Sequence, residues 1–233
     1  MDLADTIVDR PQGFDVGNRH FYLYPMTLGK MYLVSRLMDM LELRPDVMKR
    51  NPYIEAYRVA KEKKEICCKI ITYHTTRTKA KALDVEFIDN RTKYFASHCT
   101  AEEVATAFSV VLLWNKAAAL MSLLKIDKEH ERMSKVASVK KTKNNYMFGG
   151  MSVYGSLIDV ACEKYGWTYD YVVWEISYLN LKLLIADGYK QIYLSDEEAK
   201  KVKVPTKAHY VNGDDPEAVK ALIEQMGWKK EKH

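Results

Sequence analysis

The side chains that could carry catalytic chemistry are few and lie far apart. His98 and Cys99 come nearest to the thiol–imidazole pair of a cysteine nucleophile, but adjacent residues on a helix point in different directions. Asp159 and Glu163 are four residues apart, which places two carboxylates on one helix face. General acid–base catalysis would need that pair in a cleft, whereas an exposed face is its ordinary setting. The sequence therefore favours neither chemistry.

Motifs for metal, phosphate and hydrolase sites are absent from the chain. It contains no HExxH, GxSxG or GxGxxG, and Gly29-Lys30 lacks the upstream glycine and the following Ser or Thr of a phosphate-binding loop. The six histidines are scattered, with none paired at metal-ligand spacing. We therefore predict a protein that is not an enzyme and has no catalytic residues, no metal and no cofactor.

Composition and charge limit the class of protein only broadly. The chain of 233 residues is 48% apolar, which is enough for a substantial core. A net charge of +5, with acids and bases interleaved, does not demand a nucleic-acid partner. The cysteines form no CxxC pair, and we expect them to be reduced and mostly buried: Cys67, Cys68, Cys99 and Cys162.

The beginning of the chain bears on where the protein acts. Its first residues contain acids and lack an apolar segment, so they predict no signal peptide. No stretch elsewhere reaches about 18 uninterrupted apolar residues, the length that a membrane span needs. We expect no membrane partner and a cytosolic location in the cell that makes the protein.

Periodicity predicts a mainly α fold, a helical protein with a small N-terminal β-hairpin and a C-terminal helical hairpin. Residues 1–12 are expected to be disordered. Residues 13–130 form an N-terminal helical domain, with a β-hairpin around Gly17-Asn18. Residues 131–148 are a basic linker, and residues 149–233 form the C-terminal helical-hairpin region.

Capping residues and apolar stripes place the individual helices. In the N-terminal part we expect one helix from Thr27 to near Pro45, one from Asn51-Pro52 to Ile71, and one within 74–99 with a break near Asn90. A further helix runs from the Thr100 capping box to Ile126. Two more follow near the end of the chain, one after the Ser195 capping box and one over 217–226. The first of these helices carries a methionine-rich stripe, which we interpret as core filler and not as a binding site.

The C-terminal hairpin has more apolar surface than two helices can bury between them. Ser152 is a plausible N-cap, Gly166 suits the left-handed residue that ends a helix, and Thr168 can cap a second helix that ends at Gly188. That second helix is apolar nearly all round. It must therefore be buried in a larger core or covered by a partner.

The same residues carry a resemblance to a known family. The segment 149–188 contains Tyr165-Gly166-Trp167 followed by Trp174-Glu175-Ile176. It resembles the C-terminal part of phage tail assembly chaperones, particularly those of phages and prophages of Bacteroides-type bacteria. Residues 14–43, a hairpin running into a helix, are similar to the front of these proteins. Many members have proline after the WxI pattern, where this chain has Ser177, so the second helix is expected to run straight.

The resemblance implies a role in assembly. Such chaperones coat the aggregation-prone tape-measure protein while the tail tube polymerises around it, and then leave. It thus implies the tape-measure protein as partner, with the tail tube protein as a further candidate, in the host bacterial cytoplasm and not in the mature virion. Self-association of the chain stays open.

The partner-binding residues are expected at the corner of the C-terminal hairpin and along its second helix, because Trp and Tyr are enriched at binding hot spots. The predicted set is Trp167, Tyr171, Trp174, Tyr178 and Leu181. Burial of each aromatic residue in a core is the alternative interpretation.

Two other functions are open at this point. One is a structural tail-completion or connector component of the virion. The other is a helical nucleic-acid-binding adaptor, suggested by the basic stretch 134–145 and by a hairpin that looks like a helix-turn-helix. Nucleic acid is not favoured, because the second helix offers Asp170 and Glu175 against a single basic residue, Lys182, and acids repel phosphate.

Overall fold

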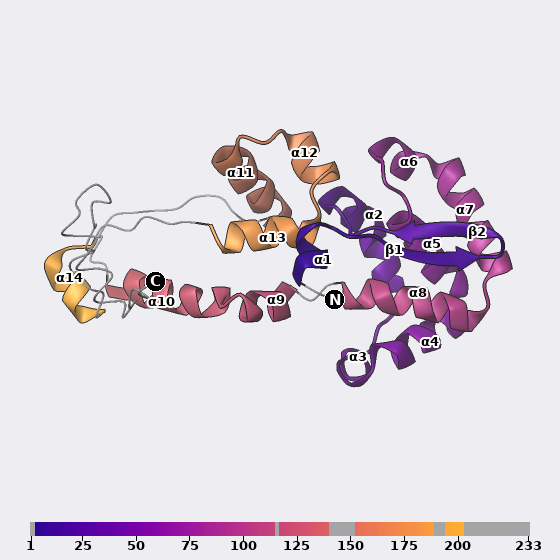
Figure 1. The fold of residues 1–233 in the computed structure, drawn as a ribbon, viewed down its shortest axis with the longest axis horizontal. Coiled ribbons are helices and arrows are strands. Elements are labelled where there is room, and N and C mark those ends of the chain that lie inside the picture. Colours follow the sequence, from indigo (N-terminus) through magenta and orange to yellow (C-terminus); the bar gives the residue numbers. More distant parts are fainter. Residues whose placement is uncertain (1–2, 115–116, 140–151, 189–193, 203–233) are drawn as a thin grey trace, which may run out of the picture. The chain divides into compact units, whose positions relative to one another are not determined.

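The computed structural model describes residues 3–114, 117–139, 152–188 and 194–202. The chain divides into two compact units, one formed by 1–129 with 146–189 and the other by 130–145 with 190–233. The described residues are mainly helical and include a two-stranded antiparallel sheet, which confirms the predicted fold class (Figure 1).

The predicted N-terminal hairpin is present as β1 (Gln12–Val16) and β2 (Arg19–Leu23). Gly17 has φ +57, the left-handed conformation that the tight turn requires. Phe14 pairs with Phe21, and both rings pack against the buried ring of Phe95. The hairpin therefore contributes one apolar face to the core.

Helices account for the rest of the N-terminal part. They are α1 (Leu3–Ile7), α2 (Leu28–Met40), α3 (Pro45–Arg50), α4 (Pro52–Glu62), α5 (Lys64–His74), α6 (Lys79–Leu83), α7 (Val85–His98) and α8 (Ala101–Leu113). Small residues on α4, Ala56 and Ala60, are fully buried in the same core as Ala105 and Phe108 of α8. Such small side chains permit close helix packing around the larger aromatic ring.

Several predicted helix boundaries were wrong. The helix expected from Asn51 to Ile71 is divided at Lys63, and the break expected near Asn90 lies at Asp84, whose carboxylate caps α7 by accepting the Phe87 N–H. Thr100 forms its predicted capping box, but α8 ends at Leu113. The expected continuation to Ile126 is replaced by α9 (Ala117–Leu123) and α10 (Ile126–Val139), with Lys125 at φ +60 between them.

The start of the chain differs from the expected disorder. Residues 3–7 form α1, and the side-chain amide of Asn180 donates to the carbonyl oxygens of Thr6 and Ile7, each at 3.2 Å. Such a long-range contact leaves no trace in local periodicity. The expected basic linker 131–148 begins inside α10, and its remaining residues lie outside the described ranges, as does the predicted helix 217–226.

The C-terminal hairpin begins as predicted. In α11 (Val153–Tyr165), Ser152 is the N-cap and Gly166 ends the helix with φ +66. Thr168 caps α12 (Tyr169–Trp174) by accepting the Tyr171 N–H. In the second unit, Ser195 forms the predicted capping box at the start of α14 (Asp196–Lys201).

The straight second helix was a wrong prediction, because the chain breaks between α12 and α13 (Tyr178–Ala186). Buried Ser177 is extended, with φ −65 and ψ 142, and caps α13. Its backbone pairs with Thr27, and the Tyr178 N–H donates to the Met26 carbonyl at 2.8 Å. Ser177 thus interrupts the helix through pairing with a distant segment of the chain.

Helices α11–α13 pack in the same compact unit as the N-terminal helices, which differs from the predicted division at residue 149. The ring of Trp174 lies on Gly29 of α2 so closely that a Cβ there would be 2.9 Å from it. Lys79 of α6 and Asp170 of α12 form an exposed ion pair at 2.7 Å, which connects α12 to a second helix of the N-terminal part. A helix packed on α2 in this way buries apolar surface that the hairpin alone could not cover.

Candidate partner-binding site: a methionine-lined pocket

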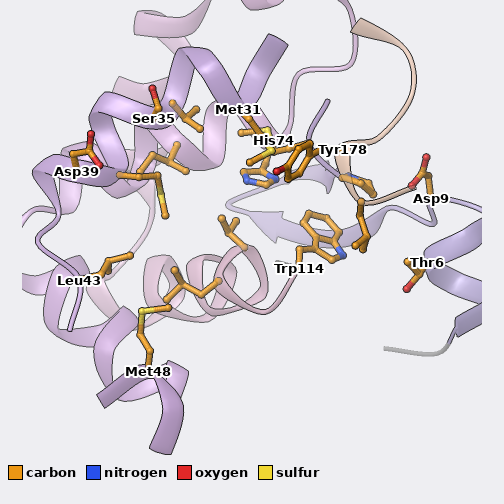
Figure 2. A pocket seen from close by; sticks show the side chains of 18 of the residues that line it. Thr6, Asp9, Met31, Ser35, Asp39, Leu43, Met48, His74, Trp114 and Tyr178 are labelled. Carbon is orange, nitrogen blue, oxygen red and sulfur yellow. The ribbon is translucent and has the colours of Figure 1, made fainter. Parts of the chain in front are cut away.

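One face of α2 borders a pocket of about 350 Å³ (Figure 2). Met31, Val34, Ser35, Met38 and Asp39 line it, a spacing of three or four residues that places all of them on one side of the helix. Met31 and Met38 are only partly buried. The interpretation of this methionine stripe as core filler alone was therefore incomplete.

The other walls come from residues that flank α2 and from segments that are distant in the sequence. They include Met26, Leu43, Met48, Val111, Leu112, Trp114, Tyr154, Tyr178 and Leu179. In Figure 2, Leu43 and Met48 lie toward one end of the pocket, while Tyr178 and Trp114 lie nearer to Asp9. Methionine is unbranched and polarizable, so a pocket with four methionines can adapt to apolar ligands of different shape.

The inner wall is uncharged at neutral pH. His74 is buried, its ring stacks on Trp114 at a centroid distance of 5.5 Å, and its Nδ1–H donates to the Tyr24 carbonyl at 3.1 Å. Burial lowers the pKa of His74 to about 3, and the positive charge of Lys30 acts in the same direction. The imidazole is therefore a neutral part of the wall.

Lys30 of α2 is buried and is not among the residues that line the pocket. Its ammonium donates to the Thr76 carbonyl at 3.1 Å, and desolvation lowers its pKa to about 8 against the opposing charge of Asp9. Burial raises the pKa of Asp9, while hydrogen bonds from Ser177 and Asn180 oppose that rise. Asp9, which follows α1, thus interacts with Lys30 of α2 and with Asn180 of α13.

The charged side chains that line the pocket are all acidic. They are Asp5, Asp9 and Asp39, and no Lys or Arg of the described residues lines it. Asp5 is paired with Arg10 at 3.0 Å, whereas Asp39 is exposed on α2. The pocket is thus apolar inside with an acidic rim.

The structure separates the predicted partner-binding residues. Tyr178 lines the pocket, and Trp174 is partly buried on α2. Trp167 packs against Tyr171 at a centroid distance of 5.1 Å, and Tyr171 is 42% exposed. Leu181 is completely buried among α11–α13, so it offers no surface to a partner in this conformation.

Sequence reasoning missed Ser35, Asp39 and Trp114 as pocket residues. A signal for two of them was present, because Ser35 and Asp39 interrupt the apolar stripe of α2 at the same spacing as its methionines. A polar residue within an apolar stripe indicates a face that is not wholly packed. Trp114 carries no such signal, since it follows directly on the apolar end of α8.

The residues first considered for catalysis lie apart from this pocket. Burial raises the pKa of the Cys99 thiol, which favours the protonated form and not the nucleophilic thiolate. The His98 ring stacks on Tyr94, while Asp159 and Glu163 are exposed on α11. Within the described ranges, no three His, Cys, Asp or Glu side chains are grouped as a metal site would need.

Comparisons with known proteins leave the chain without an assigned family. It matches no protein-family model, no curated protein and no solved structure. Among the helices that the structure describes, none has the length and apolar composition needed to cross a bilayer.

Proposed function

We propose that this protein is a phage tail assembly chaperone that binds the tape-measure protein and keeps it soluble while the tail tube polymerises. The observation that carries the proposal is the adaptable apolar pocket of about 350 Å³ on α2. A long amphipathic helix in water exposes an apolar stripe, and an apolar groove on a partner can cover that stripe until tube subunits replace it.

The family-like segment and the pocket meet at one residue. Tyr178 comes shortly after the Trp174-Glu175-Ile176 motif and, like Met31, lines the pocket. A tape-measure protein presents many different apolar segments, and a methionine-lined surface suits such a varied client. The acidic rim opposes the alternative of a nucleic-acid adaptor, since carboxylates repel phosphate.

In this proposal the protein acts in the host bacterial cytoplasm and is not retained in the mature virion. The tail tube protein is a second candidate partner, because it replaces the chaperone on the same client. A structural tail-completion or connector component would instead be found in purified virions. Mass spectrometry of purified particles separates these two functions.

The test is co-expression with a fragment of the tape-measure protein encoded by the same phage or prophage. We expect the wild-type chain to raise the soluble fraction of the fragment, and Tyr178→Ser to reduce that effect. Tyr169→Ser is the matched control, because Tyr169 is 62% exposed and lies outside the pocket lining. Equal precipitation of the fragment with and without the wild-type chain would contradict the chaperone function.

A further inference from the structure

The pocket face of α2 has the dimensions of a short helix-binding groove. From Met31 to Asp39 it extends over eight residue steps, which corresponds to about 12 Å or about two helical turns. An amphipathic helix that lies in a groove presents anchors at positions i, i+3 or i+4, and i+7, which also cover about two turns. The groove therefore fits about three apolar anchors of one helix.

The charged side chains at the groove favour a positively charged ligand. Asp39 is exposed on the pocket side of α2, and no ion pair of Asp39 occurs within the described part of the chain. Asp9 lies toward the opposite end of the pocket in Figure 2. His74 is neutral, and no Lys or Arg of the described residues lines the pocket. The buried ammonium of Lys30 partly offsets Asp9, so Asp39 carries the less compensated negative charge.

We propose that this pocket binds a basic amphipathic helical segment of the client protein, with apolar anchors among Met31, Met38 and Tyr178 and with Lys or Arg side chains facing Asp39 and Asp9. The assignment rests on the proposed chaperone function and adds to it the class of segment that is recognised. Apolar contacts supply most of the binding, while the rim charges supply selectivity and speed of association.

The first experiment identifies the preferred segment. Overlapping peptides of about 20 residues that cover the tape-measure sequence are tested by fluorescence anisotropy against the wild-type chain. The bound peptides should combine an apolar stripe with positive net charge, and their affinity should fall as salt increases, since exposed charges are screened beyond about 8 Å at physiological ionic strength. Binding mainly of acidic peptides would overturn the proposal.

The second experiment fills the pocket from an exposed position. Ser35 lines the pocket but is exposed, so Ser35→Trp should fold normally and reduce peptide affinity by about tenfold or more, the effect of losing a hot-spot contact. Arg36→Trp adds the same ring at the next exposed position of α2, outside the lining, and should leave affinity unchanged. Melting temperatures of both variants equal to that of the wild-type chain establish that folding is intact.

The third experiment reverses one rim charge. Asp39→Lys should weaken binding of a basic peptide about fivefold at low salt, a size typical of exposed ion pairs, and should strengthen binding of the same peptide with Glu in place of Lys. Asp159→Lys makes the same change in net charge on α11, away from the pocket lining, and should change affinity less than twofold.

The outcomes distinguish this inference from the chaperone function. Suppose that the wild-type chain solubilises the tape-measure fragment and that the Ser35→Trp and Asp39→Lys variants do so equally well. The pocket is then not the binding site, so the inference about the pocket fails while the chaperone function stands. If the wild-type chain solubilises nothing and binds no peptide, both fail. Self-association that Ser35→Trp abolishes, without peptide binding, would assign the pocket to a second copy of the chain and overturn the inference.

Discussion

The N-terminal core and the C-terminal helices α11–α13 bury their apolar residues in different ways. Among the described residues, the N-terminal core contains seventeen buried apolar side chains in one cluster, whereas the cluster within α11–α13 contains three: Ala161, Val172 and Leu181. Val173 and Leu183 are also buried but lie outside that cluster. Because three such side chains are too few to stabilise a hairpin, α12 rests on α2 through Trp174 and Gly29. One region supports itself, and the other depends on its neighbour.

This difference places the open surface at the junction of the two regions. The pocket has walls from α2 and α8 of the first region and from α11 and α13 of the second. The surplus of apolar residues in 152–188 is thus only partly used by docking on α2. Some apolar residues of this segment, among them Tyr178, border the pocket that we propose for the client.

The largest expected effect tests the self-supporting region. Phe108→Ala should lower the free energy of unfolding by about 3–5 kcal/mol, because a completely buried ring leaves a cavity. Leu181→Ala, in the small cluster, should cost about 2–5 kcal/mol and reduce amide protection mainly in α11–α13. Urea unfolding and hydrogen exchange measure both. Global loss of protection in Leu181→Ala would contradict the distinction between the regions.

Acid should act through the N-terminal region. Folding lowers the pKa of His74 from 6.5 to about 3, so the unfolded chain binds more protons between these values, and the free energy of unfolding falls as pH decreases from 6.5 to 3. The full effect is at most about 4 kcal/mol. His74→Gln should flatten this slope. An unchanged slope in His74→Gln would refute the assignment.

The contact between the regions is tested by two aromatic residues of α12. Trp174→Ala should cost about 2–3 kcal/mol, because its ring packs on Gly29, whereas Tyr169→Ala, at a side chain that is 62% exposed, should cost less than about 0.5 kcal/mol. Thermal unfolding measures both. If the two variants were equally stable, Trp174 would not hold α12 on α2, and its predicted role in partner binding would gain support.

The smallest effect concerns the break between α12 and α13. Ser177→Ala removes the cap that accepts the Asn180 N–H and the hydrogen bond to Asp9, and should cost about 1–2 kcal/mol. Thr168→Ala removes only the exposed cap of α12 and should cost about 0.5–1 kcal/mol. A Ser177→Ala variant as stable as wild type would mean that the backbone pairing with Thr27 alone ends α12.

The sequence by itself determined the features that depend on a few consecutive residues. Gly17 set the hairpin, the Thr100 capping box began α8, and Ser152 and Gly166 bounded α11 as predicted. These signals act within one turn of the chain, because a cap or a left-handed glycine satisfies backbone groups of its immediate neighbours. Such signals are readable without any knowledge of packing.

Only the tertiary structure decided what depends on residues far apart. The break at Ser177 comes from pairing with Thr27, α1 is held by Asn180, and the pocket joins α2 with Tyr178. Helical periodicity marks Met31 and Met38 as apolar but does not reveal whether another helix covers them. That depends on which elements dock against α2 and how closely, a choice made by shape and burial across more than a hundred residues of chain.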